Sequence, residues 1–346
     1  MQINLSERTF HVKEGEAAFQ GGRKERHAII VSITDDLGKR IGLGECSPLA
    51  GISCDADAYL RMSDAARLIN EALQSEDYTR QLAPYPALLF ALESALYDYQ
   101  QNPLLYDTPF AHSQIGIPSY AVIDVEGYDQ MLNRCKRMIL KGFRHLKLRI
   151  GVGEGADVLK VIRTLRSRFS EDTLKLSIDA QGNYGLEEAK GLLRELKPFD
   201  IHQVEQPIKR YQWKDMAELC RMAREEGMPP VALDEELIGV NTLTEKCMLL
   251  DTIRPQFIVI KPMLHGGITG AVEWASEAMK RDIGIVVSAA QEGNIGLRNV
   301  ALLAARIFGS QCTEAQGLGT GPMYRGDTEM DIEMQGNKLW RSPVED

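Results

Sequence analysis

Short apolar runs from residue 145 onwards each carry charged residues at or just before their ends. These residues are Lys147 and Arg149 in HLKLRIG, Asp179 in LKLSIDA, Glu205 in IHQVEQP, Asp234 in PVALDEE and Lys261 in FIVIKP. Each run has the length of a buried strand and is followed by a stretch with helical periodicity. The charges therefore recur where the strands of a parallel α/β barrel end, and in such a barrel these ends share one pocket.

The repeating pattern also predicts the fold class and the domain organisation. From residue 114 to residue 315, apolar runs and amphipathic stretches alternate as seven or eight βα units, which favours a modified (β/α) barrel of the TIM type. Residues 1–113 hold two strand-like runs, HAIIVSITDD and RIGLGECSPL, followed by helical stretches, so we expect an α+β capping domain there. Residues 316–346 do not continue the pattern, and we expect them to return to that capping domain.

Three acids follow three consecutive predicted strands. Asp179, Glu205 and Asp234 would repel one another in a shared pocket unless a cation lay between them. Each acid alone is better explained as the N-cap of the following helix. Three in succession, with Glu235 and Glu236 directly after the last, exceed what capping requires. Because carboxylates are hard oxygen ligands, the set indicates a Mg²⁺ site in which Mn²⁺ could substitute.

Three cations are predicted at the same pocket. Lys147 and Arg149 are two residues apart, so a strand places both side chains on one face. Lys261 ends its run directly before a proline, which directs it into the mouth of the barrel or onto a carboxylate there. Inward cations need anions to meet them, and the three acids supply those anions. We therefore expect an acid/base site with a metal ion.

Composition limits the functional classes. The net charge of −9, with no basic block to offset it, argues against a nucleic-acid partner. The six cysteines include no CxxC pair, which is typical of reduced thiols in a cytoplasmic protein. No apolar run approaches the length of a membrane span, and the first residues lack the apolar core of a signal peptide. We expect a cytoplasmic protein without a membrane partner, and the sequence leaves its oligomeric state open.

Several motifs together resemble a known family. The KxK-like strand, IDAQGN, VEQP, LDEE, IKP with a following HGG, and the late QEGNIGL resemble the enolase superfamily in its muconate lactonizing branch. GECSPLAGIS, ALDEELIGV, IRPQFIVIKPMLHGG and GLGTG are most similar to the o-succinylbenzoate synthase family. The resemblance covers nearly the whole chain. The same branch also contains dipeptide epimerases and N-acylamino acid racemases.

The resemblance carries expectations for the site. It implies that Asp179, Glu205 and Asp234 bind Mg²⁺, and that the metal holds the carboxylate of a small-molecule substrate. A base would then remove the proton next to this carboxylate while the metal and nearby cations stabilise the enediolate, an arrangement for which this superfamily is itself an established example. In the synthase family, a hydroxyl leaves from the adjacent carbon and an aromatic product of menaquinone biosynthesis forms. The implied substrate contacts are Ser288, Ala289, Gln291, Gly22 and Ser53.

The sequence departs from the family at the catalytic base. The second position of the KxK pair is Arg149, and an arginine does not lose its proton near neutral pH. One interpretation is a synthase in which Lys261 or Lys147 is the base of a one-base syn elimination and Arg149 is a fixed cation. The alternatives are another enzyme of the branch, such as an epimerase or racemase, and a non-catalytic relative that keeps the fold and the metal.

Overall fold

Seven parallel strands form the sheet that the apolar runs predict. The computed structural model describes residues 1–13, 25–38, 41–58, 61–124, 127–151, 155–319 and 324–342. The strands lie in sequence order: β5 (Ala121–Asp124), β6 (His145–Arg149), β7 (Lys175–Asp179), β8 (Gln203–Glu205), β9 (Val231–Leu233), β10 (Phe257–Ile260) and β11 (Gly284–Val287). Every neighbouring pair is parallel. The predicted barrel-type α/β fold is confirmed.

A two-residue segment lies between the two outer strands of this sheet. Gln316 forms a parallel bridge with Ser119, just before β5, and Gly317 forms one with Ser288, just after β11. Backbone hydrogen bonds of 2.8 Å, from Gln316 N to Pro118 and from Gly317 N to the end of β11, fix the segment in place. The segment therefore links β5 to β11 in the position of an eighth strand.

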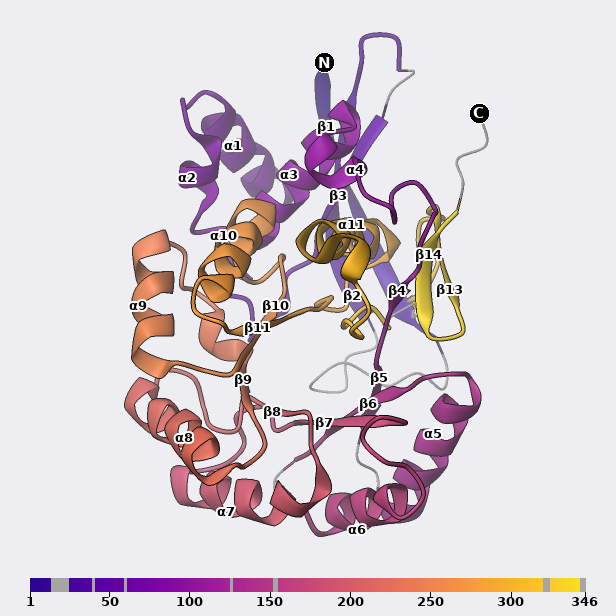
Figure 1. Ribbon diagram of the computed structural model, residues 1–346. Helices are drawn as coiled ribbons and strands as arrows, with labels where there is room; N and C mark the ends of the chain where they lie inside the picture. Colours follow the sequence, from indigo (N-terminus) through magenta and orange to yellow (C-terminus); the bar gives the residue numbers. More distant parts are fainter. Residues whose placement is uncertain are drawn as a thin grey trace.

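Helices cover the outside of the sheet. They are α5 (Tyr128–Leu140), α6 (Gly155–Arg166), α7 (Leu186–Leu196), α8 (Trp213–Glu226), α9 (Leu243–Ile253), α10 (Gly267–Met279) and α11 (Asn294–Phe308), with 3₁₀ turns η1 (Lys197–Phe199), η2 (Glu235–Leu237) and η3 (Gly309–Gln311). Figure 1 shows α5 to α9 as an arc around the strands. In α8, Met216, Leu219, Cys220 and Ala223 are buried, which is the spacing of one helical face against the sheet. No helix in the described ranges is long and apolar enough to cross a membrane.

The N-terminal residues form an antiparallel sheet with helices packed on it. Its strands are β1 (Gln2–Val12), β2 (Glu25–Thr34) and β3 (Ile41–Cys46), and the helices are α1 (Met62–Leu73), α2 (Tyr78–Leu82), α3 (Pro86–Gln100) and α4 (Pro103–Tyr106). The sheet order is β12-β1-β2-β3, where β12 (Tyr324–Arg325) comes from the C-terminal part of the chain. Helix α3 crosses β3 so closely that a Cβ on Gly44 would lie 1.8 Å from the carbonyl oxygen of Ala91. Glycine at this position therefore permits the contact between helix and sheet.

A third sheet contains the last described strands. The hairpin of β13 (Ile332–Gln335) and β14 (Lys338–Arg341) pairs with β4 (Ile117–Pro118), directly before the barrel. Arg341 forms an ion pair with Asp331, and Arg298 of α11 forms another with Asp98 of α3. The segment after residue 316 thus contacts both the first sheet, through β12, and the start of the barrel. The domain boundaries expected from the sequence remain predictions.

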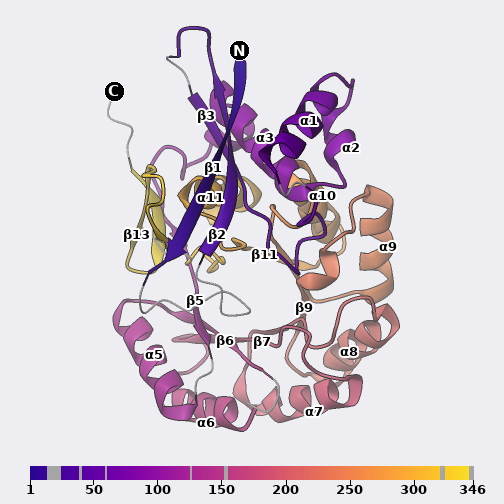
Figure 2. The ribbon, with the colours of Figure 1, turned by 180° about the vertical axis from the view of Figure 1, so that it is seen from behind.

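Two buried glutamates of the N-terminal domain bind the first turns of two barrel helices. Glu93 on α3 accepts three hydrogen bonds at the start of α10. The backbone N of Ile268 donates one at 2.5 Å, and the backbone N and the hydroxyl group of Thr269 donate the other two. Glu45 on β3 accepts hydrogen bonds from Gly293 N at 2.8 Å and Gly296 N at 3.0 Å, at the start of α11. Figure 2, seen from behind, shows the N-terminal strands beside α11. A carboxylate at a helix N-terminus satisfies free N–H groups and interacts favourably with the helix dipole.

We expect Glu93→Ala to lower the free energy of unfolding by about 3 kcal/mol, because two backbone N–H groups and one hydroxyl lose a buried acceptor. Urea unfolding monitored by circular dichroism measures the change. Glu71→Ala is the matched control, since Glu71 lies on the surface of α1 in an exposed pair with Arg67, and it should cost less than about 0.5 kcal/mol. Equal stability of Glu93→Ala and wild type would show that this carboxylate does not hold the two domains together.

Candidate active site

A row of charged residues crosses the carboxyl ends of four adjacent strands in register. Asp124 of β5 lies opposite Arg149 of β6, Arg149 lies opposite Asp179 of β7, and Asp179 lies opposite Glu205 of β8. Because the strands are short and end together, the alternation of side chains places all four on the same edge of the sheet. The row contains three carboxylates and one guanidinium, and it forms one wall of a cavity of about 640 Å³.

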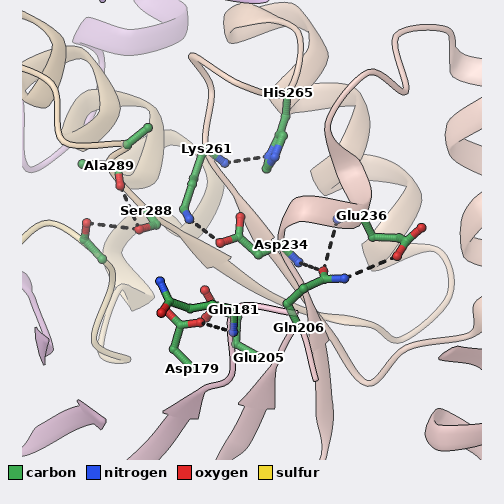
Figure 3. A network of polar contacts seen from close by, with 12 residues as sticks. Asp179, Gln181, Glu205, Gln206, Asp234, Glu236, Lys261, His265, Ser288 and Ala289 are labelled. Carbon is green, nitrogen blue, oxygen red and sulfur yellow. Dashed lines mark hydrogen bonds and ion pairs between the residues drawn. The ribbon is translucent and has the colours of Figure 1, made fainter. Parts of the chain in front are cut away.

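The cavity brings together most of the residues predicted from the sequence. Its lining includes Lys147, Arg149, Asp179, Glu205, Asp234, Lys261, Ser288, Ala289 and Gln291. Figure 3 shows how Asp179, Glu205, Asp234 and Lys261 converge from neighbouring strand ends. The opposite wall comes from the N-terminal domain and includes Arg26, Leu49 and Ile52. The cavity therefore lies between the strand ends and the N-terminal domain.

Each predicted metal ligand is paired with a basic side chain. The Nζ atom of Lys147 donates a hydrogen bond to Glu205, and that of Lys261 donates one to Asp234. Nε of Arg149 lies 3.5 Å from Asp179. Burial raises the pKa of Asp179 above its usual value, and the charge of Glu205 adds to this effect. Burial also raises the pKa of Glu205. The basic side chains thus compensate carboxylates that burial destabilises.

The same carboxylates suit a hard cation. Oδ1 of Asp234 and Oε2 of Glu235 are buried and have no hydrogen-bond partner. Across the described ranges, no three His, Cys, Asp or Glu side chains stand together as a preformed metal cluster, since the carboxylates turn to basic side chains instead. Oxygen donors from three neighbouring strands, one with an unsatisfied atom, are the ligand chemistry of Mg²⁺. The donor set fits the predicted ion.

Lys147 is enclosed by neighbours that keep it charged. Its Nζ atom donates a hydrogen bond to the hydroxyl of Tyr120 at 2.8 Å and lies 4.4 Å from the centre of that ring. Burial opposes the charge of Lys147, but Glu205 and Tyr120 outweigh burial and raise the pKa of the lysine above its usual value. The Tyr120 hydroxyl in turn donates to Oγ of Ser288 at 3.4 Å. These contacts therefore stabilise the charged form of Lys147.

Lys261 is the more accessible lysine. Its side chain is 20% exposed, compared with 4% for Lys147. Burial opposes its charge, but Asp234 and Glu205 outweigh burial and raise its pKa above the usual value. The backbone N of Lys261 donates to Nδ1 of His265 at 2.9 Å, as Figure 3 shows. Since burial lowers the pKa of His265 well below its usual range, this histidine is neutral and supports the turn that carries Lys261.

Gln206, the glutamine that follows Glu205 in the VEQP motif, contacts the loop after β9. Its backbone is in the left-handed region, with φ of 40°. Its side-chain oxygen accepts hydrogen bonds from the backbone N of Asp234 and of Glu236, both at 3.1 Å. Its amide nitrogen donates to Glu236 at 3.3 Å (Figure 3). Gln206 thereby fixes the loop after β9 that presents Asp234 to the cavity.

The predicted substrate contacts do not all lie at the cavity. Ser288, Ala289 and Gln291 line the cavity. Ser53, in contrast, is absent from the lining, and its hydroxyl accepts a hydrogen bond from Leu49 N at 2.8 Å. Ser53 thus shapes the turn on which Leu49 and Ile52 reach the cavity, and its contact with a substrate stays a prediction. Gly22 lies outside the described residues.

Sequence reasoning missed two residues of the site. Asp124 directly follows the apolar run of β5, so the rule that found the other acids could have found it too. Tyr120 lines the cavity beneath Lys147, but a tyrosine at the start of a strand resembles any half-apolar core residue. Only the geometry identifies its role.

The comparisons with known proteins agree with this architecture. The fold and the site define a capped barrel with carboxylates and lysines at the ends of its strands. Residues 130–322 match the family described as "Enolase C-terminal domain-like". The chain belongs to this family, and thus to the enolase superfamily.

Individual relatives carry out different reactions. The chain is 34% identical over 257 residues to an o-succinylbenzoate synthase of Desulfotalea psychrophila. The aligned region covers 74% of this chain and 68% of that protein. It is 28% identical over 297 residues to an L-Ala-D/L-Glu epimerase of Bacillus subtilis, covering 80% of this chain and 77% of that protein. A dipeptide epimerase structure from Enterococcus faecalis, complexed with Mg and the dipeptide L-Leu-L-Tyr, shares the fold with a TM-score of 0.81 at 18% identity, covering 99% of this chain and 96% of that one.

Proposed function

We propose that this protein is a Mg²⁺-dependent o-succinylbenzoate synthase, a lyase that dehydrates 2-succinyl-6-hydroxy-2,4-cyclohexadiene-1-carboxylate. The observation that carries the proposal is the asymmetry of the basic residues. Lys261 follows β10 and Arg149 ends β6, with three strands between them in the curled sheet. Of these two residues on opposite sides of the cavity, Arg149 stays protonated near neutral pH, whereas a metal ion on Asp234 and Glu205 would offset the charges that raise the pKa of Lys261 and so let the lysine exchange a proton.

This asymmetry favours dehydration over epimerisation. An epimerase that inverts a carbon must remove a proton from one face and deliver another to the opposite face, which requires two groups that transfer protons. A syn dehydration needs one such group, because the proton and the hydroxyl leave from the same face. The cavity offers Lys261 for that role, because its side chain is 20% exposed, whereas that of Lys147 is 4% exposed and is bonded to both Glu205 and Tyr120.

The residues divide the proposed chemistry among them. Asp179, Glu205 and Asp234 would hold Mg²⁺, which when bound would bind the substrate carboxylate and stabilise the enediolate as a Lewis acid. Lys261 would take the proton next to the carboxylate and return it to the departing hydroxyl group. Arg149 and Lys147 would remain charged and attract the negative charge that develops on the substrate. Formation of the aromatic ring supplies much of the driving force.

A dipeptide epimerase is the second candidate, supported by the epimerase relative that covers 80% of the chain. It would require a proton-transferring group on the Arg149 side of the cavity. Asp124 is the acid nearest to Arg149 on that side, but it forms an ion pair with the guanidinium. The epimerase proposal therefore has the weaker support.

The test is an assay of the purified protein with Mg²⁺ in D₂O. We expect formation of o-succinylbenzoate from the cyclohexadiene carboxylate, measured by ultraviolet absorbance. We also expect no inversion of L-Ala-L-Glu or of hydrophobic dipeptides, measured by proton NMR as deuterium incorporation and change of configuration. Inversion of a dipeptide without dehydration would replace the synthase proposal with the epimerase proposal. No reaction with either class would favour a non-catalytic relative.

A further inference from the structure

We infer that Asp124 is a positioning residue that holds Arg149 away from Asp179 and thereby keeps Asp179 available to a metal ion. The inference rests on the proposed metal site and assigns a role to a residue outside the predicted ligands and bases. Asp124 and Arg149 both line the cavity, and each side chain is 24% exposed.

The register of the sheet places Arg149 between two carboxylates. Asp124 and Asp179 lie directly opposite Arg149 on its two neighbouring strands. A guanidinium carries five N–H donors in a planar fork, so different edges of it can bind the two carboxylates, whereas the three donors of a lysine ammonium all come from one nitrogen. An arginine at this position is thus matched to a carboxylate on each side.

The distances show which carboxylate binds Arg149 more closely. One terminal nitrogen of Arg149 donates to Asp124 at 2.9 Å, whereas Nε lies 3.5 Å from Asp179. The second contact is at the outer limit of a hydrogen bond. Asp124 therefore makes the shorter hydrogen bond to Arg149 and Asp179 the longer one.

Asp124 is itself held in position from outside the barrel. Its other carboxylate oxygen lies 3.9 Å from a guanidinium nitrogen of Arg134 on α5. Asp124 therefore lies between two cations, Arg134 outside the barrel and Arg149 at the cavity. Arg134 thus supports the arrangement without reaching the cavity lining.

Loss of the charge at Asp124 would change the environment of Asp179 in two ways that act in the same direction. Arg149 would turn more closely to Asp179, and a cation on a ligand carboxylate competes directly with the metal. The wall of the cavity would also lose one negative charge that attracts a divalent cation. Both effects weaken metal binding at Asp179.

The experiment measures the dissociation constants of Mg²⁺ and Mn²⁺ by calorimetry for wild type, Asp124→Asn and the control Asp129→Asn. Asp129 lies on the exposed side of the first turn of α5. We expect binding about tenfold weaker in Asp124→Asn, in the range of other residues that orient metal ligands, and unchanged binding in Asp129→Asn. Asp124→Glu keeps the charge and should retain most of the affinity.

A double-variant cycle separates positioning from a general structural effect. In the background Arg149→Met the cation that competes for Asp179 is gone, so adding Asp124→Asn should leave only the effect of the lost wall charge and weaken metal binding clearly less than it does in the wild-type background. Arg149→Met alone should bind the metal more tightly than wild type, and this holds as a test even if Asp124→Asn does not fold. Equal affinity of Asp124→Asn and wild type, or weaker binding in Arg149→Met, would overturn the inference. Absence of metal binding in wild type would overturn the proposed metal site, and with it this inference.

Discussion

We expect Lys261→Ala to lower turnover of the cyclohexadiene carboxylate by about 10³-fold or more, the scale of removing a general base. Lys261 is the lysine that reaches the cavity with a partly exposed side chain, and its backbone is fixed by His265. The rate of o-succinylbenzoate formation at saturating substrate and Mg²⁺ measures the effect. Lys160→Ala is the matched control, because Lys160 is a 62% exposed lysine on α6, and it should react at the wild-type rate.

The companion change Arg149→Lys identifies which side of the cavity transfers the proton. If Arg149 acts only as a fixed cation, a lysine at this position keeps the charge, and turnover should be similar or change modestly. Full activity in Lys261→Ala would contradict the proposed base. Lys147 would then be the residue to test, together with Tyr120, whose hydroxyl accepts its hydrogen bond.

We expect Glu205→Gln to abolish calorimetric binding of Mg²⁺ and Mn²⁺. Glu205 lies beside Asp179 in the register of the sheet and is 1% exposed, so it is the central acid of the proposed ligand set. Its replacement removes one ligand charge and leaves the buried Lys147 without its carboxylate partner, which disfavours a second cation nearby.

Two further measurements control the Glu205→Gln experiment. Glu218→Gln changes a 42% exposed glutamate on α8 that pairs with Lys190, and it should bind the metal as wild type does. Thermal unfolding shows whether Glu205→Gln is folded, since a buried lysine without its partner also lowers stability. A folded Glu205→Gln variant with unchanged metal affinity would rule out Glu205 as a ligand.

The sequence predicted which charged residues line the cavity wherever a charge lies at the end of a buried strand. Asp179, Glu205 and Lys261 could be found because apolar runs locate the strands, and parallel strands end at one edge. The eighth strand position could not be predicted, since Gln316 and Gly317 form only isolated bridges and two residues have no recognisable periodicity.

The pairing of charges was also beyond the sequence. That Lys147 binds Glu205 while Lys261 binds Asp234 depends on which side chains meet across the cavity. The run of residues along each strand contains no such information. The same holds for Tyr120, whose hydroxyl matters only because the sheet brings it beneath Lys147.

The two glutamates that bind the helix N-termini have a consequence for protein engineering. One way to change the substrate specificity of such a protein is to build a chimera, in which the N-terminal domain of one relative is grafted onto the barrel of another. Glu93 and Glu45 bind the first turns of α10 and α11, directly after the loops that carry Lys261 and Ser288. A donor domain without acids at both positions would leave those turns without acceptors, and the graft would disturb the loops that carry Lys261 and Ser288. The recipient barrel therefore restricts which capping domains can be exchanged.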